Sequence, residues 1–405
     1  MDRSNISVAA TAISKELQLN TVELGFILSA FGWSYAALQI PGGILVDRFG
    51  PRIVYAIGLF TWSLVTLMQG FIKGFTGLFG LRLATGAFEA PAYPANNRIV
   101  TSWFPTHERA SAIAVYTSGQ YLGLAFLTPL LFKLQDYVGW RGLFIITGIV
   151  GILWAIVWWF FYRDPAEHKK VTEQELDYIE KGGGLVNRKD GSGVTSRQNT
   201  FNWRDLGTIF SYRKLWGVYL GQFAINSTLW FFLTWFPTYL VQYRGMSFLK
   251  SGYLTMVVFL AAFFGVLSSG FISDYMLRRG FSAAAARKRP VIAGLLLSIS
   301  IIGANYVESP ALIIMFMAIA FFGNGFASIT WVFVSTLAPK HLVGLTGGVF
   351  NFIGNLASVI VPIVIGILAK GGDFKPALIF IACLGLAGAC SYIFLVGKPE
   401  RIEIP

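Results

Sequence analysis

The chain has 405 residues, of which 55% are hydrophobic and only 13% are charged, and its mean hydropathy is +0.61. This composition is too apolar for a soluble globular protein and indicates a membrane protein. The formal net charge of +12 does not indicate nucleic-acid binding, because most Lys and Arg residues fall in alternate loops between apolar segments, as the orientation rule for membrane proteins describes.

Residues 1–14 are compatible with a membrane helix but are too few to cross a bilayer. Fourteen helical residues cover about 21 Å, whereas the hydrocarbon core is about 30 Å thick. We expect them to form the outer half of a first spanning helix whose cytoplasmic half is missing, because the start is placed too late or the chain is truncated. The alternative is that Met1 is the natural start and that the N-terminal bundle is incomplete.

Eleven further segments are long and apolar enough to cross a membrane, for which about 18 residues suffice. All but one lack Asp, Glu, Lys and Arg, and the exception, at 78–101, contains only Arg82, Glu89 and Arg98. In chain order the predicted spans are 24–46, 53–72, 78–101, 110–132, 142–162, 215–243, 251–273, 290–307, 309–339, 342–369 and 376–397. With the first helix they predict an all-α integral membrane protein of twelve helices.

A short motif recurs at the ends of two of these spans. GILVDRFGPR occupies 43–52, and a degenerate copy, GFISD at 270–274, is followed by two arginines at 278–279. Such repetition indicates two similar halves, which in transporters can rock against each other about a central site. We expect 1–163 and 214–405 to form two six-helix bundles related by a pseudo-twofold axis.

The distribution of basic residues predicts the orientation of the chain. Lys and Arg concentrate in the segments 47–52, 98–109, 163–214, 274–289, 340 and 398–405. These segments are therefore expected to be cytoplasmic. Residues 164–213 would form a cytoplasmic connection between the bundles, and the C-terminus would be cytoplasmic.

No residue pattern predicts a metal site, a cofactor or an enzyme. Cys383 and Cys390 lie in the last apolar span, where Cys acts as a small apolar side chain. His107, His168 and His341 lie in or beside predicted cytoplasmic loops without ligand spacing. No nucleophile with a nearby base and no phosphate-binding loop is evident.

Four ionisable residues lie inside predicted spans and away from the cytoplasmic ends of those spans, where such side chains are costly and usually functional. They are Asp2, Arg3, Arg82 and Glu89. Counting helical rise places Asp2, Arg3 and Glu89 near the middle of the membrane. Arg82 lies seven residues before Glu89, so both are on roughly one helix face. We interpret Arg82 mainly as a structural partner of Asp2 or Glu89.

These residues suggest the transport of an anion together with protons. The planar fork of Arg3 can bond both oxygens of a carboxylate. Glu89 is followed by APAYP, whose prolines would loosen the helix. A low dielectric disfavours its ionised form, while a nearby arginine favours it. Glu89 or Asp2 could therefore take and release a proton.

Uncharged polar side chains from both halves are expected at about the same depth. Each amide could instead simply bond a neighbouring helix. Together they suit the hydroxyl groups of a small polyhydroxy acid, and the residues are Tyr35, Gln120, Gln222, Asn226 and Asn351.

Several longer motifs resemble the anion:cation symporter branch of the major facilitator superfamily. They include DRSNISVA at 2–9, the 43–52 loop, FEAPAYPANNRIVTSWFPTHERASA at 88–112 and FFGNGFASITW at 321–331. Within that branch the chain looks most like bacterial D-galactonate:proton symporters, through TSGQYLGLAFLTPLL at 117–131, GVYLGQFA at 217–224 and LTGGVFNF at 345–352. Glucarate transporters are the nearest competitors.

The resemblance implies roles for particular residues. Asp2, Arg3 and Glu89 would handle protons and the carboxylate. A sugar-acid pocket would be lined by Tyr35, Gln120, Ser328, Thr330, Trp331 and Asn351, with Gln222 and Asn226 as weaker candidates. A cytoplasmic gate would be formed by Asp47, Arg48, Arg52 and Asp274. A purely topological role for the gate arginines is the alternative.

The residues predict a proton-coupled transporter of a small polyhydroxy acid, and the resemblance implies that this acid is a sugar acid, D-galactonate before others, imported across a bacterial inner membrane. Its partners would be the sugar-acid anion, protons and the lipid bilayer, and the resemblance implies a monomer. Glucarate, another hexonate or another organic anion remains an alternative substrate. A proton-independent anion exchanger and a non-transporting membrane sensor remain alternative functions.

Overall fold

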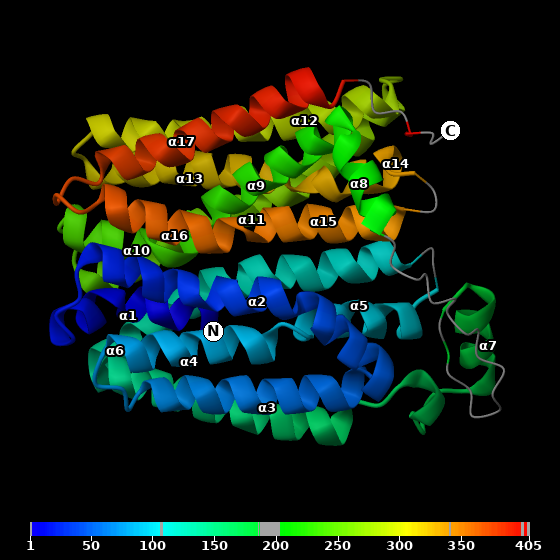
Figure 1. Ribbon diagram of the computed structural model, residues 1–405, viewed down its shortest axis with the longest axis horizontal. Helices are drawn as coiled ribbons and strands as arrows, with labels where there is room; N and C mark the ends of the chain where they lie inside the picture. The colour runs from blue at the N-terminus through cyan, green and yellow to red at the C-terminus, as the bar shows by residue number, and fades with distance from the viewer. Residues whose placement is uncertain are drawn as a thin grey trace.

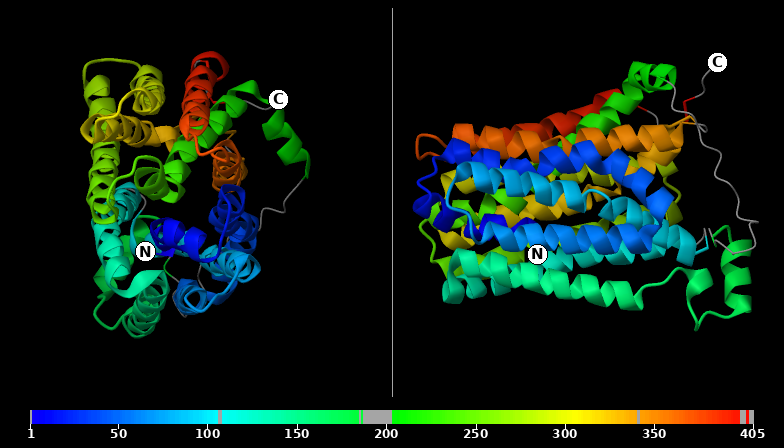
Figure 2. Two further views of the ribbon diagram at one scale, coloured as in Figure 1. Left: turned by 90° about the vertical axis from the view of Figure 1, so that its left-hand side faces the viewer. Right: turned by 60° about the horizontal axis from the view of Figure 1, so that its bottom comes forward.

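The computed structural model describes residues 2–105, 108–184, 186, 203–339, 342–397 and 401–402. Throughout these residues the regular structure is helical. Most helices run along the long axis of the molecule, with the N-terminal helices on one side and the C-terminal helices on the other (Figure 1). The helix α7 lies beyond one end of this bundle, which we name the α7 end, and we name the opposite end the far end (Figures 1 and 2).

Six helices make up the N-terminal half: α1 (Asp2–Glu16), α2 (Thr21–Phe49), α3 (Pro51–Gln69), α4 (Phe75–Glu89), α5 (Ala92–Trp103) and α6 (Arg109–Phe161). A capping box starts α2, since the Asn20 side chain accepts from the Glu23 N–H and the Glu23 carboxylate accepts from the Asn20 N–H, both at 2.9 Å. Within α6, Gly139 has φ of 71°, so the predicted spans 110–132 and 142–162 are two helices that meet there.

The predicted span 78–101 is interrupted directly after Glu89. The helix α4 ends at Glu89 and α5 begins at Ala92, with Pro91 between them. Proline has no N–H to donate and its ring clashes with the preceding turn, so the regular helix is disturbed here. The intervening Ala90 and Pro91 keep right-handed helical backbone angles, so the helix is locally loosened beside Glu89, as expected, and is not fully broken.

The predicted connection between the halves carries short helices of its own. They are η1 (Pro165–Glu167), α7 (Glu173–Lys181) and α8 (Trp203–Ser211). On α7, Leu176 and Ile179 are buried against Val186. Residues 185 and 187–202 of the connection lie outside the described part of the chain.

The C-terminal half supplies the remaining predicted spans. Its elements are α9 (Arg213–Thr234), α10 (Phe236–Thr238), η2 (Tyr239–Tyr243), α11 (Phe248–Arg278), α12 (Ala283–Ser298), η3 (Ile299–Tyr306), α13 (Pro310–Phe326), η4 (Ser328–Thr330), α14 (Trp331–Leu337), α15 (Val343–Asn355), α16 (Ala357–Leu368), α17 (Lys375–Cys390) and η5 (Ser391–Leu395). Helices therefore occupy every predicted span, although several spans are built from two or three successive pieces.

The two halves pack closely at the far end. There α2 meets α16, and a Cβ on Gly25 would lie 2.6 Å from the carbonyl oxygen of Pro362. Similarly, α6 meets α11, where the rings of Phe132 and Phe248 are 4.5 Å apart. Toward the α7 end, by contrast, α2 has few contacts with α15. The interface is therefore closed at the far end and looser at the α7 end.

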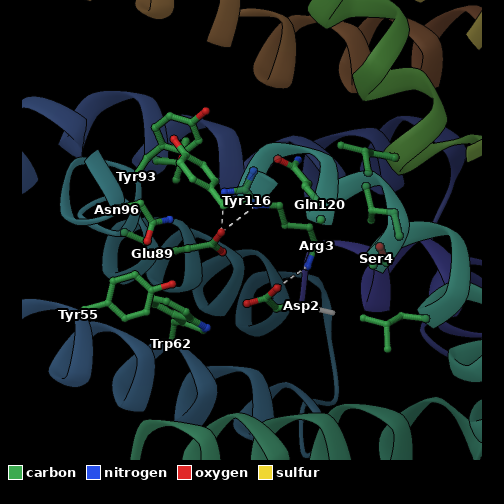
Figure 3. Close-up of a pocket in the computed structure, with 17 residues that line it drawn as sticks. Asp2, Arg3, Ser4, Tyr55, Trp62, Glu89, Tyr93, Asn96, Tyr116 and Gln120 are labelled. Carbon is green, nitrogen blue, oxygen red and sulfur yellow. Dashed lines mark hydrogen bonds and ion pairs between the residues drawn. The ribbon is translucent and has the colours of Figure 1, made fainter. Parts of the chain in front are cut away.

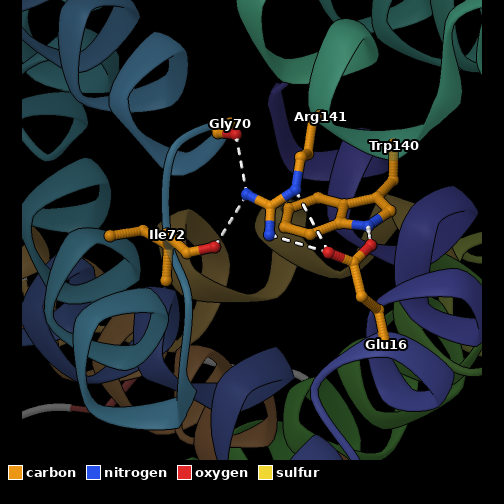
Figure 4. A network of polar contacts seen from close by, with 5 residues as sticks. All are labelled: Glu16, Gly70, Ile72, Trp140 and Arg141. Carbon is orange, nitrogen blue, oxygen red and sulfur yellow. Dashed lines mark hydrogen bonds and ion pairs between the residues drawn. The ribbon is translucent and has the colours of Figure 1, made fainter.

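A polar cluster at the far end fixes the end of α1 against the rest of its half (Figure 4). The Arg141 guanidinium donates to Glu16 Oε1 at 2.8 Å and to the carbonyl oxygens of Gly70 and Ile72 at 3.0 and 2.8 Å. Glu16 Oε2 accepts from the Trp140 indole at 2.6 Å. This Arg141 cluster joins α1, the α3–α4 loop and the second part of α6, and so it holds the helix that carries Arg3.

Candidate functional site

Arg3 of α1 and Glu89 of α4 form an ion pair (Figure 3). Arg3 Nε and Nη2 both donate to Glu89 Oε1, at 2.8 and 2.5 Å. Glu89 Oε2 is buried and has no hydrogen-bond partner among the described residues. The two side chains retain only 25% and 9% of their exposure. One carboxylate oxygen therefore carries the whole interaction, and the other is open to a proton.

Packing of α1 and α2 sets the position of Arg3. The guanidinium carbon lies 5.0 Å from the centre of the Phe31 ring and 4.9 Å from that of Tyr35. Two residues further along α1, the Asn5 amide donates to the Thr147 hydroxyl at 2.7 Å, which ties the helix to α6. Aromatic faces stabilise a cation at this distance. The Arg3 guanidinium is thus held against the aromatic rings of Phe31 and Tyr35.

Close approach of α2 and α4 sets the position of Glu89. A Cβ on Gly86 would overlap the Phe31 carbonyl oxygen, so only glycine fits there. The Ser34 hydroxyl also donates to the Leu83 carbonyl oxygen at 2.6 Å. These contacts place the last turn of α4 beside Arg3.

Asp2 lines the same cavity as the Arg3–Glu89 pair, and Arg82 packs on the same Phe31 ring as Arg3. Asp2 Oδ1 accepts from the backbone N–H of Arg3 at 3.0 Å, and its carboxylate lines the adjoining cavity. Arg82 is 2% exposed, and its guanidinium carbon lies 5.3 Å from the Phe31 ring centre. Within the described chain, its Nε has no hydrogen-bond partner. The Arg82 guanidinium packs on Phe31, and its role as a structural partner of Asp2 or Glu89 stays a prediction.

A cavity of about 340 Å³ adjoins the ion pair, which is within the usual range of ligand pockets, about 300–1,000 Å³. Its polar walls come from α1 to α6 and include Asp2, Arg3, Tyr35, Tyr55, Glu89, Tyr93, Asn96, Tyr116 and Gln120, most of which are labelled in Figure 3. The cavity lies in the N-terminal half, with Leu233 as its contribution from the other half.

A second, smaller pocket of about 140 Å³ lies between the two halves. We name it the central pocket. The N-terminal half contributes Arg3, Tyr35, Gln39, Tyr93 and Gln120, and the C-terminal half contributes Gln222, Asn226, Leu229, Trp230, Leu233, Trp331, Asn351 and Asn355. The structure therefore brings together seven of the nine residues predicted for substrate binding.

Side-chain hydrogen bonds organise the C-terminal wall of this pocket. The Thr330 hydroxyl donates to Gln222 Oε1 at 2.7 Å, and Gln222 Nε2 donates to Asn226 Oδ1 at 3.4 Å. Thr330 thus contacts the pocket residue Gln222 but does not itself line the pocket. Ser328, two residues earlier in η4, lines neither of the two pockets.

The predicted gate residues lie at the α7 end. Asp47 and Arg48 are exposed, and Arg48 packs over the ring of Phe49 at 5.3 Å. Arg52 stays within its own half, where it donates to the Trp159 carbonyl oxygen at 3.1 Å and packs over that indole at 4.7 Å. Asp274 is in α11, and its side chain lies outside the described part of the structure.

Sequence reasoning missed Gln39, Tyr93 and Asn355 as pocket residues. A signal was present for two of them, because Gln39 lies four residues after Tyr35 and Asn355 lies four after Asn351. Residues four apart share a helix face. The described residues contain no cluster of His, Cys, Asp and Glu able to hold a metal, and His107 and His341 lie outside them.

Comparison with known proteins identifies the family to which this architecture belongs. A family model described as Major Facilitator Superfamily matches residues 1–362. The chain is 54% identical over 404 residues to a D-galactonate transporter of Escherichia coli O6:H1 (strain CFT073), covering 99% of this chain and 93% of the relative. It is 43% identical over 413 residues to the "Probable galactarate/D-glucarate transporter GarP" of Escherichia coli K12, covering 100% and 92%.

Solved structures agree with the sequence relatives on the fold. A D-xylose-proton symporter superimposes with a TM-score of 0.73 at 17% identity, covering 98% of this chain and 95% of that one. A bacterial homologue of the human lysosomal transporter Spinster, in an inward-facing and unoccupied conformation, gives 0.71 at 20% identity, covering 98% and 91%. The predicted fold class and family resemblance are confirmed. The chain belongs to the major facilitator superfamily and is a multi-pass membrane transporter.

Proposed function

We propose that this transporter imports a sugar acid together with protons by alternating access, and that D-galactonate is its preferred substrate. The observation that carries the proposal is the Arg3–Glu89 ion pair at the edge of a pocket shared by both halves. A guanidinium there can hold either the protein's own carboxylate or that of a substrate. Because Glu89 and the substrate carboxylate compete for the same guanidinium, protonation of Glu89 and binding of substrate are coupled.

The coupling follows from the cost of leaving a buried charge unpaired. When a proton binds Glu89, for example at its unpartnered Oε2, the residue becomes neutral and releases Arg3. The fork of Arg3 can then take the substrate carboxylate. After substrate leaves, Glu89 loses its proton and pairs with Arg3 again. Asp2, beside the same cavity, is the second candidate for a transported proton.

The chemistry of the central pocket supports a polyhydroxy acid. Opposite Arg3, its C-terminal wall carries the four amides of Gln222, Asn226, Asn351 and Asn355. Amides both donate and accept hydrogen bonds, as hydroxyl groups do. The names of the relatives, which include galactonate and galactarate/D-glucarate transporters, point to the same substrate class.

We propose that the α7 end faces the cytoplasm of a bacterial cell, so that the C-terminus is cytoplasmic. Basic loops at that end support this orientation. With the far end closed, the structure then corresponds to an inward-facing state. Asp47, Arg48, Arg52 and Asp274 would form a gate that assembles when the α7 end closes, which agrees with the exposure of Asp47 and Arg48 here.

The test is uptake of labelled D-galactonate into transporter-deficient cells that express the chain, with and without a proton uncoupler. Unlabelled sugar acids serve as competitors, and cells with an empty vector give the background. Accumulation that the uncoupler abolishes and that D-galactonate blocks best is expected. Uptake that the uncoupler and external pH leave unchanged would favour a proton-independent anion exchanger, and absence of uptake would contradict the proposal.

A further inference from the structure

We propose that Gln39 and Asn355 select sugar acids with one carboxylate over those with two, because their amides bind a hydroxyl group at the end of the substrate remote from Arg3. This inference rests on the proposed function and names a narrower substrate class, the aldonates. It assigns a binding role to two residues from opposite halves of the transporter. The juxtaposition that carries it is a row of three linked amides, Gln39, Asn351 and Asn355, that lines one pocket together with a single cation, Arg3.

The charges around the pocket provide for one carboxylate only. Arg3 is the one charged residue among those that line the central pocket. The adjoining cavity adds Asp2 and Glu89, which are both acids. Arg82 lines neither of these two pockets and packs on Phe31. A second carboxylate would therefore be desolvated without a counter-ion, which is unfavourable in a low-dielectric site.

The amide row runs across the interface between the halves. Asn355 Nδ2 donates to the backbone oxygen and to Oδ1 of Asn351, at 2.9 and 3.1 Å. Asn351 Nδ2 in turn donates to Gln39 Oε1 at 2.8 Å. This last hydrogen bond joins a side chain of the N-terminal half to a side chain of the C-terminal half.

These bonds leave a defined donor and a defined acceptor for a ligand. Gln39 has used its oxygen, so its Nε2 hydrogens remain available; Asn355 has used its nitrogen, so its Oδ1 remains available. Within the described residues, no hydrogen bond uses either of these two atoms. Both residues line the central pocket. The row thus presents one donor group and one acceptor to the same space.

A hydroxyl group matches this pair, and a carboxylate does not. A hydroxyl can accept from Gln39 Nε2 and donate to Asn355 Oδ1 at the same time. An ionised carboxylate only accepts, so it satisfies Gln39 but sets oxygen against oxygen at Asn355. Leaving a buried polar group unpaired is the more costly outcome. The same logic lets sites built around a hydroxyl reject analogues that cannot complete the hydrogen bond.

D-Galactonate and galactarate are the appropriate probes, because they share a carbon chain and hydroxyl configuration and differ at C6, which is an alcohol in one and a carboxylate in the other. Binding of each to the purified full chain is measured by isothermal titration calorimetry in detergent. We expect galactarate to bind at least about tenfold more weakly, as one unsatisfied buried group predicts. Uptake in cells, with galactarate as competitor, is measured in parallel.

Two variants test the assigned residues directly. Gln39→Arg places a cation in the row and should improve galactarate binding relative to galactonate by about tenfold or more. Asn355→Leu removes the acceptor, so it should weaken galactonate about tenfold and change galactarate little. The matched control is Gln242→Arg, which adds the same charge at an exposed residue of η2 outside both pockets. Monodisperse elution and a sharp thermal transition establish folding, and Gln39→Lys replaces Gln39→Arg if that variant misfolds.

The outcomes separate this inference from the proposed function. Equal binding of the two acids to the unchanged chain overturns the inference, and galactonate uptake would then still support the function. Selective binding without uptake supports the inference and contradicts the function. An unchanged ratio in both folded variants shows that the amides only join helices, which overturns their assigned role. Binding of neither acid overturns both proposals.

Discussion

Closure of the far end depends on a glycine contact between the halves, and enlarging it should open that end. Gly25 on α2 faces α16, where its added Cβ would lie 2.6 Å from the Pro362 carbonyl oxygen and 3.3 Å from Ile363 Cα. Both neighbours are backbone atoms, which cannot rotate away. Gly25→Ala therefore forces the two helices apart, and Gly25→Val does so further.

The size of the effect follows from the cost of overpacking. Adding one or more methyl groups to a close-packed contact costs about 1–3 kcal/mol. Only a state in which α2 and α16 touch bears this cost. The equilibrium should therefore shift toward far-end opening by roughly 5- to 150-fold. If the far-end-closed state predominates tenfold, Gly25→Val should make the open state a major species.

Distances between spin labels measure this shift. Lys15, at the end of α1, and Lys370, after α16, are exposed and lie on opposite halves at the far end. Cysteines at these positions, with Cys383 and Cys390 replaced, can be labelled and compared by double electron–electron resonance. The population at long distance should grow in Gly25→Val, and uptake should fall.

The control substitution is Gly80→Ala. Gly80 lies inside α4 of the same half, and a Cβ there has no other atom within 4 Å. It should leave the distance distribution unchanged. Gly366→Ala, on the partner helix, should reproduce the effect, because its Cβ would lie 2.5 Å from the Thr21 carbonyl oxygen. An unaltered distribution in folded Gly25→Val would refute the view that this contact holds the far end closed.

Four further predictions concern the ion pair, the Arg141 cluster and the gate. Glu89→Gln should retain galactonate exchange but lose accumulation driven by a pH gradient; undiminished accumulation would remove Glu89 from coupling. Arg3→Lys loses the fork and should weaken galactonate binding by roughly ten- to a hundredfold in titration calorimetry, whereas unaltered affinity would exclude Arg3 as the carboxylate site. Arg141→Met removes the bonds to α1 and the α3–α4 loop and should lower the melting temperature more than Lys73→Met, an exposed control; equal changes would show that the cluster adds no stability. Asp47→Ala should change which end of the pocket is accessible to thiol reagents, and unchanged accessibility would support a purely topological role for this loop.

The spans and the depth of the polar residues were predictable because helical rise is constant. Counting along each helix placed Arg3 and Glu89 at one level, and the structure joins them directly. The same counting placed Gln120 and Asn351 on the pocket layer. A composition that leaves few charges in the spans makes each remaining one informative.

Relative rotation and packing of helices were not predictable in this way. Sequence spacing put Arg82 on the face of Glu89, but it contained no sign that the ring of Phe31, on α2, would pack against the Arg82 guanidinium. The bond between Asn351 and Gln39 joins residues 312 positions apart, and no local pattern contains such a partner. Similarly, Arg141 binds carbonyl oxygens whose positions depend on how a loop folds.

The proposed function also gives a physical reason for substrate and proton to move together, which lies in the arrangement of Arg3. Breaking a buried ion pair by removing one partner costs about 3–5 kcal/mol, so neither an empty Arg3 beside a protonated Glu89 nor a substrate carboxylate beside an ionised Glu89 is favourable. In the first case a cation lacks its partner; in the second, two anions share one guanidinium whose Nε and Nη2 already bind Glu89 Oε1. Only when a proton binds Glu89 and a substrate carboxylate binds Arg3 together do the charges of Arg3, Glu89 and the substrate stay matched. Coupling then requires no conformational signal between a proton site and a substrate site, because the Arg3 guanidinium would take part in both.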